Sequence, residues 1–234
     1  MDNIQISAKA LGAMAMPDFC PRCFYIKLHT KKLPWQIFPG IFSTIDAYTK
    51  KIVHAWIDLS VDRETRKDCP DFLSDFGVLA YEKTPHWSKF KMETPQGITL
   101  TGGMDDLWRV PEGYVIPDYK TAKFTANADK LLPMYRTQLN GYAKIAEATG
   151  ITPVKSIVLI YFEPQTLPGY VEVGHHKNHF DMTFKPHVLS LALDINSIDP
   201  LLDRARAIYD GAIPDFGEGC KDCAALNDII GMAR

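Results

Sequence analysis

The sequence predicts a mixed α/β or α+β domain in which helices flank a central mixed sheet. Apolar residues recur at helical spacing over residues 43–59 and again over residues 133–148. Residues 97–121 have the turn chemistry of a β-hairpin, and residues 155–162 form a short apolar run rich in β-branched side chains. Helical and strand patterns that mix along one chain are typical of this class.

The composition is that of one ordinary globular domain, which we expect to span residues 1–234. Hydrophobic residues make up 46% of the chain and charged residues 23%, which argues against disorder or a fibrous repeat. The net charge of −2 gives no overall field for nucleic acid, so such binding must depend on local patches or on a metal. The sequence shows neither a long apolar run nor a secretory leader. We therefore expect a cytoplasmic protein without membrane contact.

The first part of the chain is expected to contain irregular structure and one helix. Residues 18–40 are rich in aromatic, basic and proline residues and are expected to be irregular. The helix over residues 43–59 should bury an apolar stripe that consists of Ile45, Tyr48, Ile52, Val53 and Trp56. Asp46, Lys50 and His54 are spaced four apart and therefore share the opposite face.

The elements that follow can be assigned from turn residues and apolar runs. The hairpin turns at residues 111–113, and Pro117 indicates an edge position or a bulge in its second strand. The next helix should begin at Pro133 and end before Gly150. Beyond it we expect a buried strand at residues 155–162, further strands at 169–173 and 179–184, and a last helix at 198–210.

The hairpin carries the strongest chemical signal. Asp118 and Lys120 are two residues apart on one strand, so their side chains point the same way and that of Tyr119 points the other way. A hairpin can bring Asp105 or Asp106 alongside Asp118. Mg²⁺ prefers oxygen ligands, and one or two carboxylates suffice when substrate phosphate completes its coordination. Two carboxylates and a lysine on one patch therefore favour metal-dependent chemistry at a phosphoryl group.

An ordered set of motifs surrounds this patch. In chain order it comprises Gly102-Gly103-Met104-Asp105, then Asp118-Tyr119-Lys120-Thr121, then Gln138 and Tyr142 on one face of a helix. This set resembles the PD-(D/E)XK nuclease superfamily, and most closely its RecB-like nuclease domains. The resemblance implies a restriction-endonuclease-like central sheet with a catalytic core at about residues 95–165.

The resemblance also implies a set of metal ligands. Asp105 and Asp118 would hold Mg²⁺ or Mn²⁺ together with the backbone carbonyl of Tyr119. The family spacing favours Asp105 over Asp106 as the first carboxylate. RecB-like nucleases often add a histidine from an upstream helix, and His54 is the candidate for this further ligand.

The activity implied by the resemblance is metal-dependent hydrolysis of DNA phosphodiesters. Lys120 would be the catalytic lysine, and Gln138 and Tyr142 would orient the site or contact the scissile strand. We expect an exonuclease on DNA ends or single strands, in DNA repair, recombination or CRISPR-type DNA processing. DNA is the expected partner, and a helicase, a recombinase or an integrase would be the protein partner. The alternative is a catalytically silent DNA-binding scaffold of the same fold, against which the presence of both acids and the lysine speaks.

Four of the five cysteines form two C-x-x-C pairs near opposite ends of the chain, namely Cys20 with Cys23 and Cys220 with Cys223. Four thiolates suit a [4Fe-4S] cluster or a structural zinc ion, and either would join segments 18–40 and 211–234. The CPRCFYIK stretch resembles the start of iron–sulfur RecB-like nucleases of the CRISPR-adaptation type, which favours the cluster. Those families have one N-terminal and three C-terminal cysteines, so the two-and-two arrangement here keeps zinc as the alternative.

Overall fold

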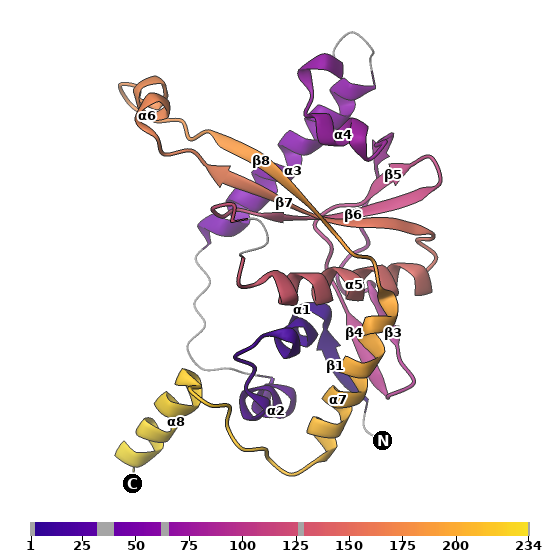
Figure 1. Ribbon diagram of the computed structural model, residues 1–234, viewed down its shortest axis with the longest axis vertical. Helices are drawn as coiled ribbons and strands as arrows, with labels where there is room; N and C mark the ends of the chain where they lie inside the picture. The colour runs from indigo at the N-terminus through magenta and orange to yellow at the C-terminus, as the bar shows by residue number, and fades with distance from the viewer. Residues whose placement is uncertain (1–2, 32–39, 62–65, 126–128, 234) are drawn as a thin grey trace.

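The computed structural model shown in Figure 1 describes residues 3–31, 40–61, 66–125 and 129–233. Its larger sheet has the strand order β2-β5-β6-β7-β8, and its smaller sheet has the order β1-β4-β3. The strands are β1 Ile4–Ser7, β2 Ala80–Tyr81, β3 Lys91–Glu93, β4 Ile98–Thr101, β5 Trp108–Val110, β6 Gly113–Lys120, β7 Val154–Pro164 and β8 Phe184–Leu191. Both sheets mix parallel and antiparallel pairs, which confirms the predicted mixed α/β class.

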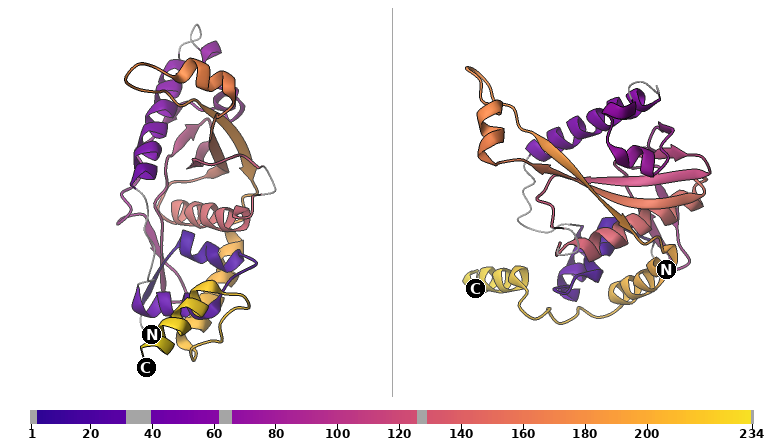
Figure 2. Two further views of the ribbon diagram at one scale, coloured as in Figure 1. Left: turned by 90° about the vertical axis from the view of Figure 1, so that its left-hand side faces the viewer. Right: turned by 45° about the horizontal axis from the view of Figure 1, so that its top comes forward.

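Helices cover both faces of the larger sheet (Figures 1 and 2). They are α1 Ala8–Gly12, α2 Pro21–Thr30, α3 Ile41–Ser60, α4 Asp71–Asp75, α5 Leu132–Ala148, α6 Pro168–Gly174, α7 Ile198–Asp210 and α8 Lys221–Met232. Helix α3 lies on one face, and α5 separates the opposite face from α1 and the smaller sheet. Within the described part of the chain, no helix has both the length and the apolar character needed to cross a membrane.

Strands β6 and β7 are parallel neighbours connected through α5, so the three elements form a β-α-β unit. The alternation of side chains along β6 assigns its residues to two different cores. Ile116 belongs to the core beneath α5, whereas Val115 and Tyr119 belong to the core beneath α3. Asp118 and Lys120 therefore share the α5 side and Tyr119 lies on the other, and the sequence had predicted this division but not which side faces α5.

Several predicted elements are confirmed within one or two residues. Helices α3, α5 and α7 match the predicted segments 43–59, 133–148 and 198–210, and β7 matches residues 155–162. The hairpin is confirmed only for its second half, because β5 and β6 pair with each other whereas β4 joins the smaller sheet beside β1. The Gly102-Gly103 stretch after β4 lets the chain leave one sheet and enter the other.

Other predictions were wrong, and each has a local cause. Residues 21–30 of the segment predicted to be irregular form α2, since Pro21 occupies a first-turn position, where a helix does not need its missing N–H. Residues 32–39 of that segment lie outside the described residues. Residues 169–173 belong to helix α6, not to a strand, and α6 likewise has a proline in its first turn. The strand predicted at 179–184 begins only at Phe184.

The helix predicted over 43–59 buries only part of its apolar stripe. Val53 is fully buried against the larger sheet, but Tyr48 is 65% exposed. Ile45, Ile52 and Trp56 are half-buried. Together with Tyr48 they line a shallow apolar groove that Met182 and Phe184 complete. Only the part of α3 that lies over the sheet is therefore covered.

Pro117 lies in an interior strand of the sheet, yet locally at an open edge. Strand β5 pairs with β6 only from Gly113 to Val115, so among the described residues the rest of this edge of β6 has no neighbouring strand. Backbone N–H groups of residues two apart point to the same edge of a strand. The missing N–H of Pro117 and the N–H of Tyr119 therefore face the same open edge, which is the position that a proline tolerates.

The contact between α1 and α5 is tight enough to exclude larger side chains. A Cβ atom added at Gly141 would lie 2.6 Å from the Cβ atom of Ala8. Gly141→Val is therefore expected to lower the free energy of unfolding by about 1–3 kcal/mol, which is usual for overpacked sites. Urea unfolding measures this change. Gly231→Val is the matched control, because a Cβ at this helical glycine meets nothing within 4 Å. Equal losses in both variants would contradict the close α1–α5 packing.

Candidate active site

Residues 102–107 connect β4 to β5 and are called the acidic loop, and this loop covers the open edge of β6. Asp105 accepts a hydrogen bond at Oδ2 from the backbone N–H of Tyr119, at 2.9 Å. Strand β5 ends before it reaches Tyr119, so this carboxylate supplies the acceptor that a neighbouring strand would otherwise provide. A backbone donor in the protein interior needs such an acceptor. The loop can follow this path because Gly102 has no side chain. A Cβ there would lie 2.8 Å from the ring of Tyr142 and 2.9 Å from that of Phe90.

Four of the predicted site residues contact one another on the α5 side of β6. Asp118 is 2% exposed, and its Oδ1 accepts a hydrogen bond from Gln138 Nε2 at 3.1 Å. Its other oxygen forms an ion pair with the Nζ of Lys120. Gln138 Nε2 also donates to the hydroxyl of Tyr142 at 2.8 Å. Helix α5 thus brings Gln138 to the carboxylate that Lys120 contacts, and Tyr142 to Gln138.

The carboxylates of Asp105 and Asp118 repel each other in this group, and burial adds a further cost for the charge of Asp118. Burial raises the pKa of Asp118 to about 6, which the ammonium of Lys120 opposes and the negative charge of Asp105 reinforces. For Lys120, burial disfavours the charged form, but the carboxylates of Asp118 and Asp105 outweigh it and raise its pKa. The lysine therefore stays protonated at neutral pH. A divalent cation between Asp105 and Asp118 would neutralise their mutual repulsion.

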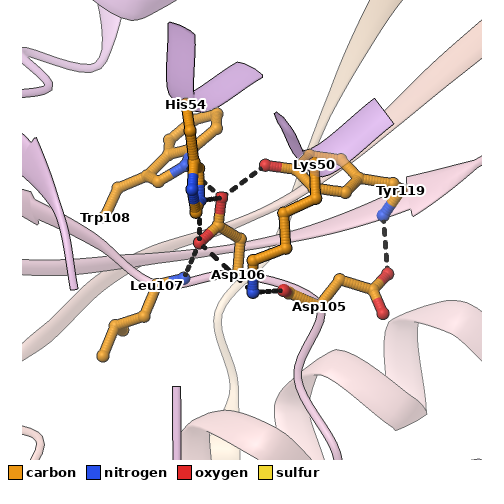
Figure 3. Close-up of polar contacts among 7 residues, drawn as sticks. All are labelled: Lys50, His54, Asp105, Asp106, Leu107, Trp108 and Tyr119. Atoms are coloured by element: carbon orange, nitrogen blue, oxygen red, sulfur yellow. Dashed lines mark hydrogen bonds and ion pairs between the residues drawn. The ribbon is translucent and has the colours of Figure 1, made fainter. Parts of the chain in front are cut away.

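Asp106 contacts Trp108 and Tyr119, which belong to the core on the α3 side (Figure 3). It is fully buried, and its oxygens accept hydrogen bonds from the N–H of Leu107 at 2.9 Å, the Nε1 of Trp108 at 3.2 Å and the hydroxyl of Tyr119 at 2.7 Å. Burial and the charge of Asp106 raise the pKa of Tyr119 well above its ordinary value, so this hydroxyl remains a donor. Both oxygens of Asp106 are therefore engaged by donors on the α3 side.

His54, predicted as a further metal ligand, lies against Asp106. Its Nε2 is 2.9 Å from Oδ2 and 3.1 Å from Oδ1 of that carboxylate, and its ring stacks on Tyr81 with centroids 3.7 Å apart. Lys50, one turn earlier on α3, donates from Nζ to the backbone carbonyl of Asp105 at 2.6 Å. The structure therefore brings His54 to the acidic loop, but on the side of β6 opposite to Asp118.

Three further residues influence the site and were not assigned to it from the sequence. The Nζ of Lys120 lies 4.7 Å from the centroid of the Tyr135 ring, a cation–π contact. The positive charge of Lys9, in α1, lowers the pKa of Asp118 against the effect of burial. Burial and the charge of Asp105 raise the pKa of Asp46 in α3. Only Asp46 had a sequence signal, its spacing with Lys50 and His54. Lys9 is far from the motifs in sequence and could not have been found.

The four predicted cysteines meet at the ends of two helices. Cys20 and Cys220 are the N-cap residues of α2 and α8, and Cys23 and Cys223 lie in the first turn of each. The Sγ atoms of Cys20 and Cys223 are 3.7 Å apart, those of Cys23 and Cys220 3.5 Å, and those of Cys23 and Cys223 3.4 Å. Helix N-termini favour thiolates because their free N–H groups and dipoles are positive. The cluster could therefore bind a metal.

The spacing of the sulfur atoms indicates the size of the group that fits. All four Sγ atoms lie within 4.8 Å of one another. A zinc–sulfur bond of about 2.3 Å gives tetrahedral sulfur–sulfur distances of about 3.8 Å, close to those observed. A four-iron cluster binds each thiolate through a different iron and needs them further apart. Although burial opposes ionisation, the N–H of Gly217, 3.2 Å from Cys20 Sγ, and the neighbouring thiols lower the pKa of Cys20 to about 7.

Comparison with known proteins adds little to this description. No protein-family model and no curated protein matches the chain. A solved structure described as the crystal structure of SSO0001 aligns with 97% of this chain and 86% of its own, at a TM-score of 0.38 and 14% sequence identity.

The raised pKa of Asp118 leads to a pH-dependent stability in the metal-free protein. Its pKa of about 6 in the folded state exceeds the ordinary value of 3.8, so the folded state holds this proton more tightly. The resulting stabilisation is present below about pH 4 and is lost as the pH rises through about 6. Asp118→Asn should therefore gain stability relative to wild type between about pH 4 and 7, by up to about 3 kcal/mol.

Urea unfolding in EDTA at several pH values measures this difference between Asp118→Asn and the wild type. A difference that stays constant with pH would contradict the burial of an ionisable carboxyl at this position.

Proposed function

We propose that this protein is a metal-dependent nuclease that hydrolyses phosphodiester bonds in DNA. The observation that carries the proposal is the convergence of Asp105 and Asp118, from separate segments, beside the protonated Lys120. Repelling carboxylates in a buried setting are an arrangement that favours a bound cation over an ordinary ion pair. The likeness of the ordered motifs to RecB-like nucleases supports the same reading.

The donor set suits Mg²⁺ or Mn²⁺, which prefer oxygen ligands. Asp105 and Asp118 would supply carboxylate oxygens. The backbone carbonyl of Tyr119 would be a third ligand, since it shares the edge of β6 on which the N–H of Tyr119 meets Asp105. A bound divalent cation would lower the pKa of its water and offset negative charge on the phosphoryl oxygens.

The remaining residues act through charge and orientation. Lys120 stays protonated because its pKa is raised, so it serves as an electrostatic and hydrogen-bonding group and not as a general base. Its ammonium can hold the attacking water or a phosphoryl oxygen as negative charge develops there. Gln138 fixes one oxygen of Asp118 and is itself bonded to Tyr142, which keeps the carboxylate in one orientation.

The substrate and the biological setting are proposed from the resemblance. An exonuclease on DNA ends or single strands would act in DNA repair, recombination or CRISPR-type processing, together with a helicase, a recombinase or an integrase. The competing function is a DNA-binding scaffold that does not cleave. The pairing of Lys120 with Asp118 and the proximity of Asp105 favour the enzyme, because a scaffold does not need a buried carboxylate beside a second, half-buried one.

Substitution of the lysine separates the two functions. Lys120→Ala is expected to reduce Mn²⁺-dependent cleavage of single-stranded DNA about 100–1,000-fold, because it removes a charge that stabilises the transition state. Lys144→Ala is the matched control, since Lys144 is similarly shielded and pairs with Asp199 at 3.0 Å, outside the site. Cleavage rates of labelled DNA measure both. Absence of cleavage by the wild type, or equal rates for Lys120→Ala, would rule out the enzyme.

The cysteine cluster is proposed to hold one structural zinc ion. Its sulfur spacing favours zinc over the [4Fe-4S] cluster that the resemblance implies, because the four thiols surround the volume of a single ion. Cys23 and Cys220 are 197 residues apart in sequence, and Cys20 and Cys223 are 203 residues apart, so the ion would fix α2 and α8 to each other. Binding free energy at such a site adds to the free energy of folding.

Elemental analysis of the purified protein tests the identity of this metal. We expect one zinc per chain, no stoichiometric iron and no brown absorbance. Cys223→Ser should lose zinc and lower the midpoint of thermal unfolding, because one of the four ligands is removed. Cys69→Ser should keep the metal, since Cys69 lies outside the cluster. Stoichiometric iron with visible absorbance would exclude zinc in favour of the cluster and leave the nuclease proposal unaffected.

A further inference from the structure

We propose a further metal site in the turn between α6 and β8, where His176, His179 and Asp181 would bind Zn²⁺ or a similar transition-metal ion. The site is separate from the candidate active site and from the cysteine cluster. Helix α6 and the turn after it lie at the outer end of the β7–β8 pair, away from the cysteine-bearing helices (Figures 1 and 2).

The backbone of the turn places the three side chains on one face. The N–H of His176 donates to the carbonyl of His179 at 3.0 Å, and the N–H of Asp181 donates to the carbonyl of Gly174 at 2.8 Å. His176 therefore lies opposite His179, and Gly174 lies opposite Asp181. Side chains directly opposite each other in an antiparallel pair share a face, and so do those of residues two apart along a strand. The local fold thus gathers the two imidazoles and the carboxylate before any ion binds.

The three side chains are close enough to hold one ion. A possible ligand atom of each lies within 4.8 Å of those of the other two. The Nε2 of His176 is 3.0 Å from Oδ2 of Asp181, and its ring stacks on that of His179 with centroids 4.4 Å apart. Metal–ligand bonds of about 2.0–2.2 Å place tetrahedral ligands about 3.3 Å from one another. All three residues are exposed, so small side-chain rotations suffice to reach this geometry.

An ordinary surface ion pair accounts for only part of this arrangement. The pairing of His176 with Asp181 is exposed to solvent, where such pairs contribute little to stability. It also does not involve His179, whose ring packs on the same imidazole from across the turn. A bound metal ion would use all three residues together.

The donor set indicates the class of ion. Two imidazole nitrogens and one carboxylate oxygen favour Zn²⁺, Ni²⁺ or Cu²⁺, whereas Mg²⁺ and Ca²⁺ prefer oxygen ligands alone. Zinc with three protein ligands keeps one coordination position for water or for a ligand from outside the chain. The three ligands all lie within residues 176–181, so this ion would not join distant segments as an ion in the cysteine cluster would. We therefore expect an accessible ion that exchanges with the solution.

Calorimetric titration of the full chain with Zn²⁺ tests the proposal. The protein carries the metal of its cysteine cluster and is kept in excess Mg²⁺, which competes for carboxylates but not for imidazoles. We expect the wild type to bind one further zinc ion at this turn. Its affinity should fall at least about 10-fold in His179→Ala, because a direct ligand is removed. No further zinc ion in the wild type, or equal affinity in His179→Ala, would overturn the proposal.

His175→Ala is the matched control. This neighbouring histidine belongs to the opposite face of the turn, where it bridges to Phe180, and its Nδ1 lies 3.2 Å from the carbonyl oxygen of Val171. The variant should bind zinc as tightly as the wild type. In ¹H–¹⁵N spectra of the wild-type histidine side chains, Zn²⁺ should shift the ring nitrogens of His176 and His179. An equal loss of affinity in His175→Ala, or shifts confined to other histidines, would contradict the site.

Discussion

The early end of β5 is the constraint on which the candidate site depends. Strand β6 continues five residues past Val115, the last of its residues that pairs with β5, and its backbone along that edge needs other partners. One donor is absent because residue 117 is proline, and the next, that of Tyr119, is satisfied by the carboxylate of Asp105. A loop carboxylate thus substitutes for a strand. The same contact places a negative charge beside Asp118. One arrangement therefore both provides an acceptor for the N–H of Tyr119 and forms the acidic site.

This arrangement has a cost in stability that a cation would offset. Asp118 is buried, its pKa is raised, and Lys120 compensates only part of the desolvation and of the repulsion from Asp105. Functional sites often retain such unfavourable groups, while the surrounding structure supplies the stability. Here the surroundings are the β6–α5–β7 unit on one side and the closed hydrogen bonds around Asp106 on the other. The acidic loop is held between two well-packed cores, so it can keep its charge in place without a ligand.

The cysteine cluster lies apart from the candidate site and brings together the two ends of the chain. The larger sheet and α5 contain the candidate site, but α2 and α8 are peripheral and have little core of their own (Figure 1). Each begins with a C-x-x-C pair at its N-terminus, and the two N-termini face each other. A single ion at this point would join the two ends of the chain and hold them against the domain. By contrast, the first half of the apolar stripe of α3 extends past the sheet, and Tyr48 there stays exposed.

The sequence by itself determined the elements with strong periodicity and indicated candidate residues for the site. The apolar spacing of α3, α5 and α7 and the alternation in β6 are local properties, so they could be predicted together with the shared face of Asp118 and Lys120. Helix α2 and helix α6 were missed because their proline-containing starts look like irregular chain. Only the tertiary structure decided what each of the two adjacent acids contacts, because such contacts depend on packing and not on position in the sequence. It likewise decided that His54 meets Asp106, since a helix face specifies a direction but not the partner that packing brings to it.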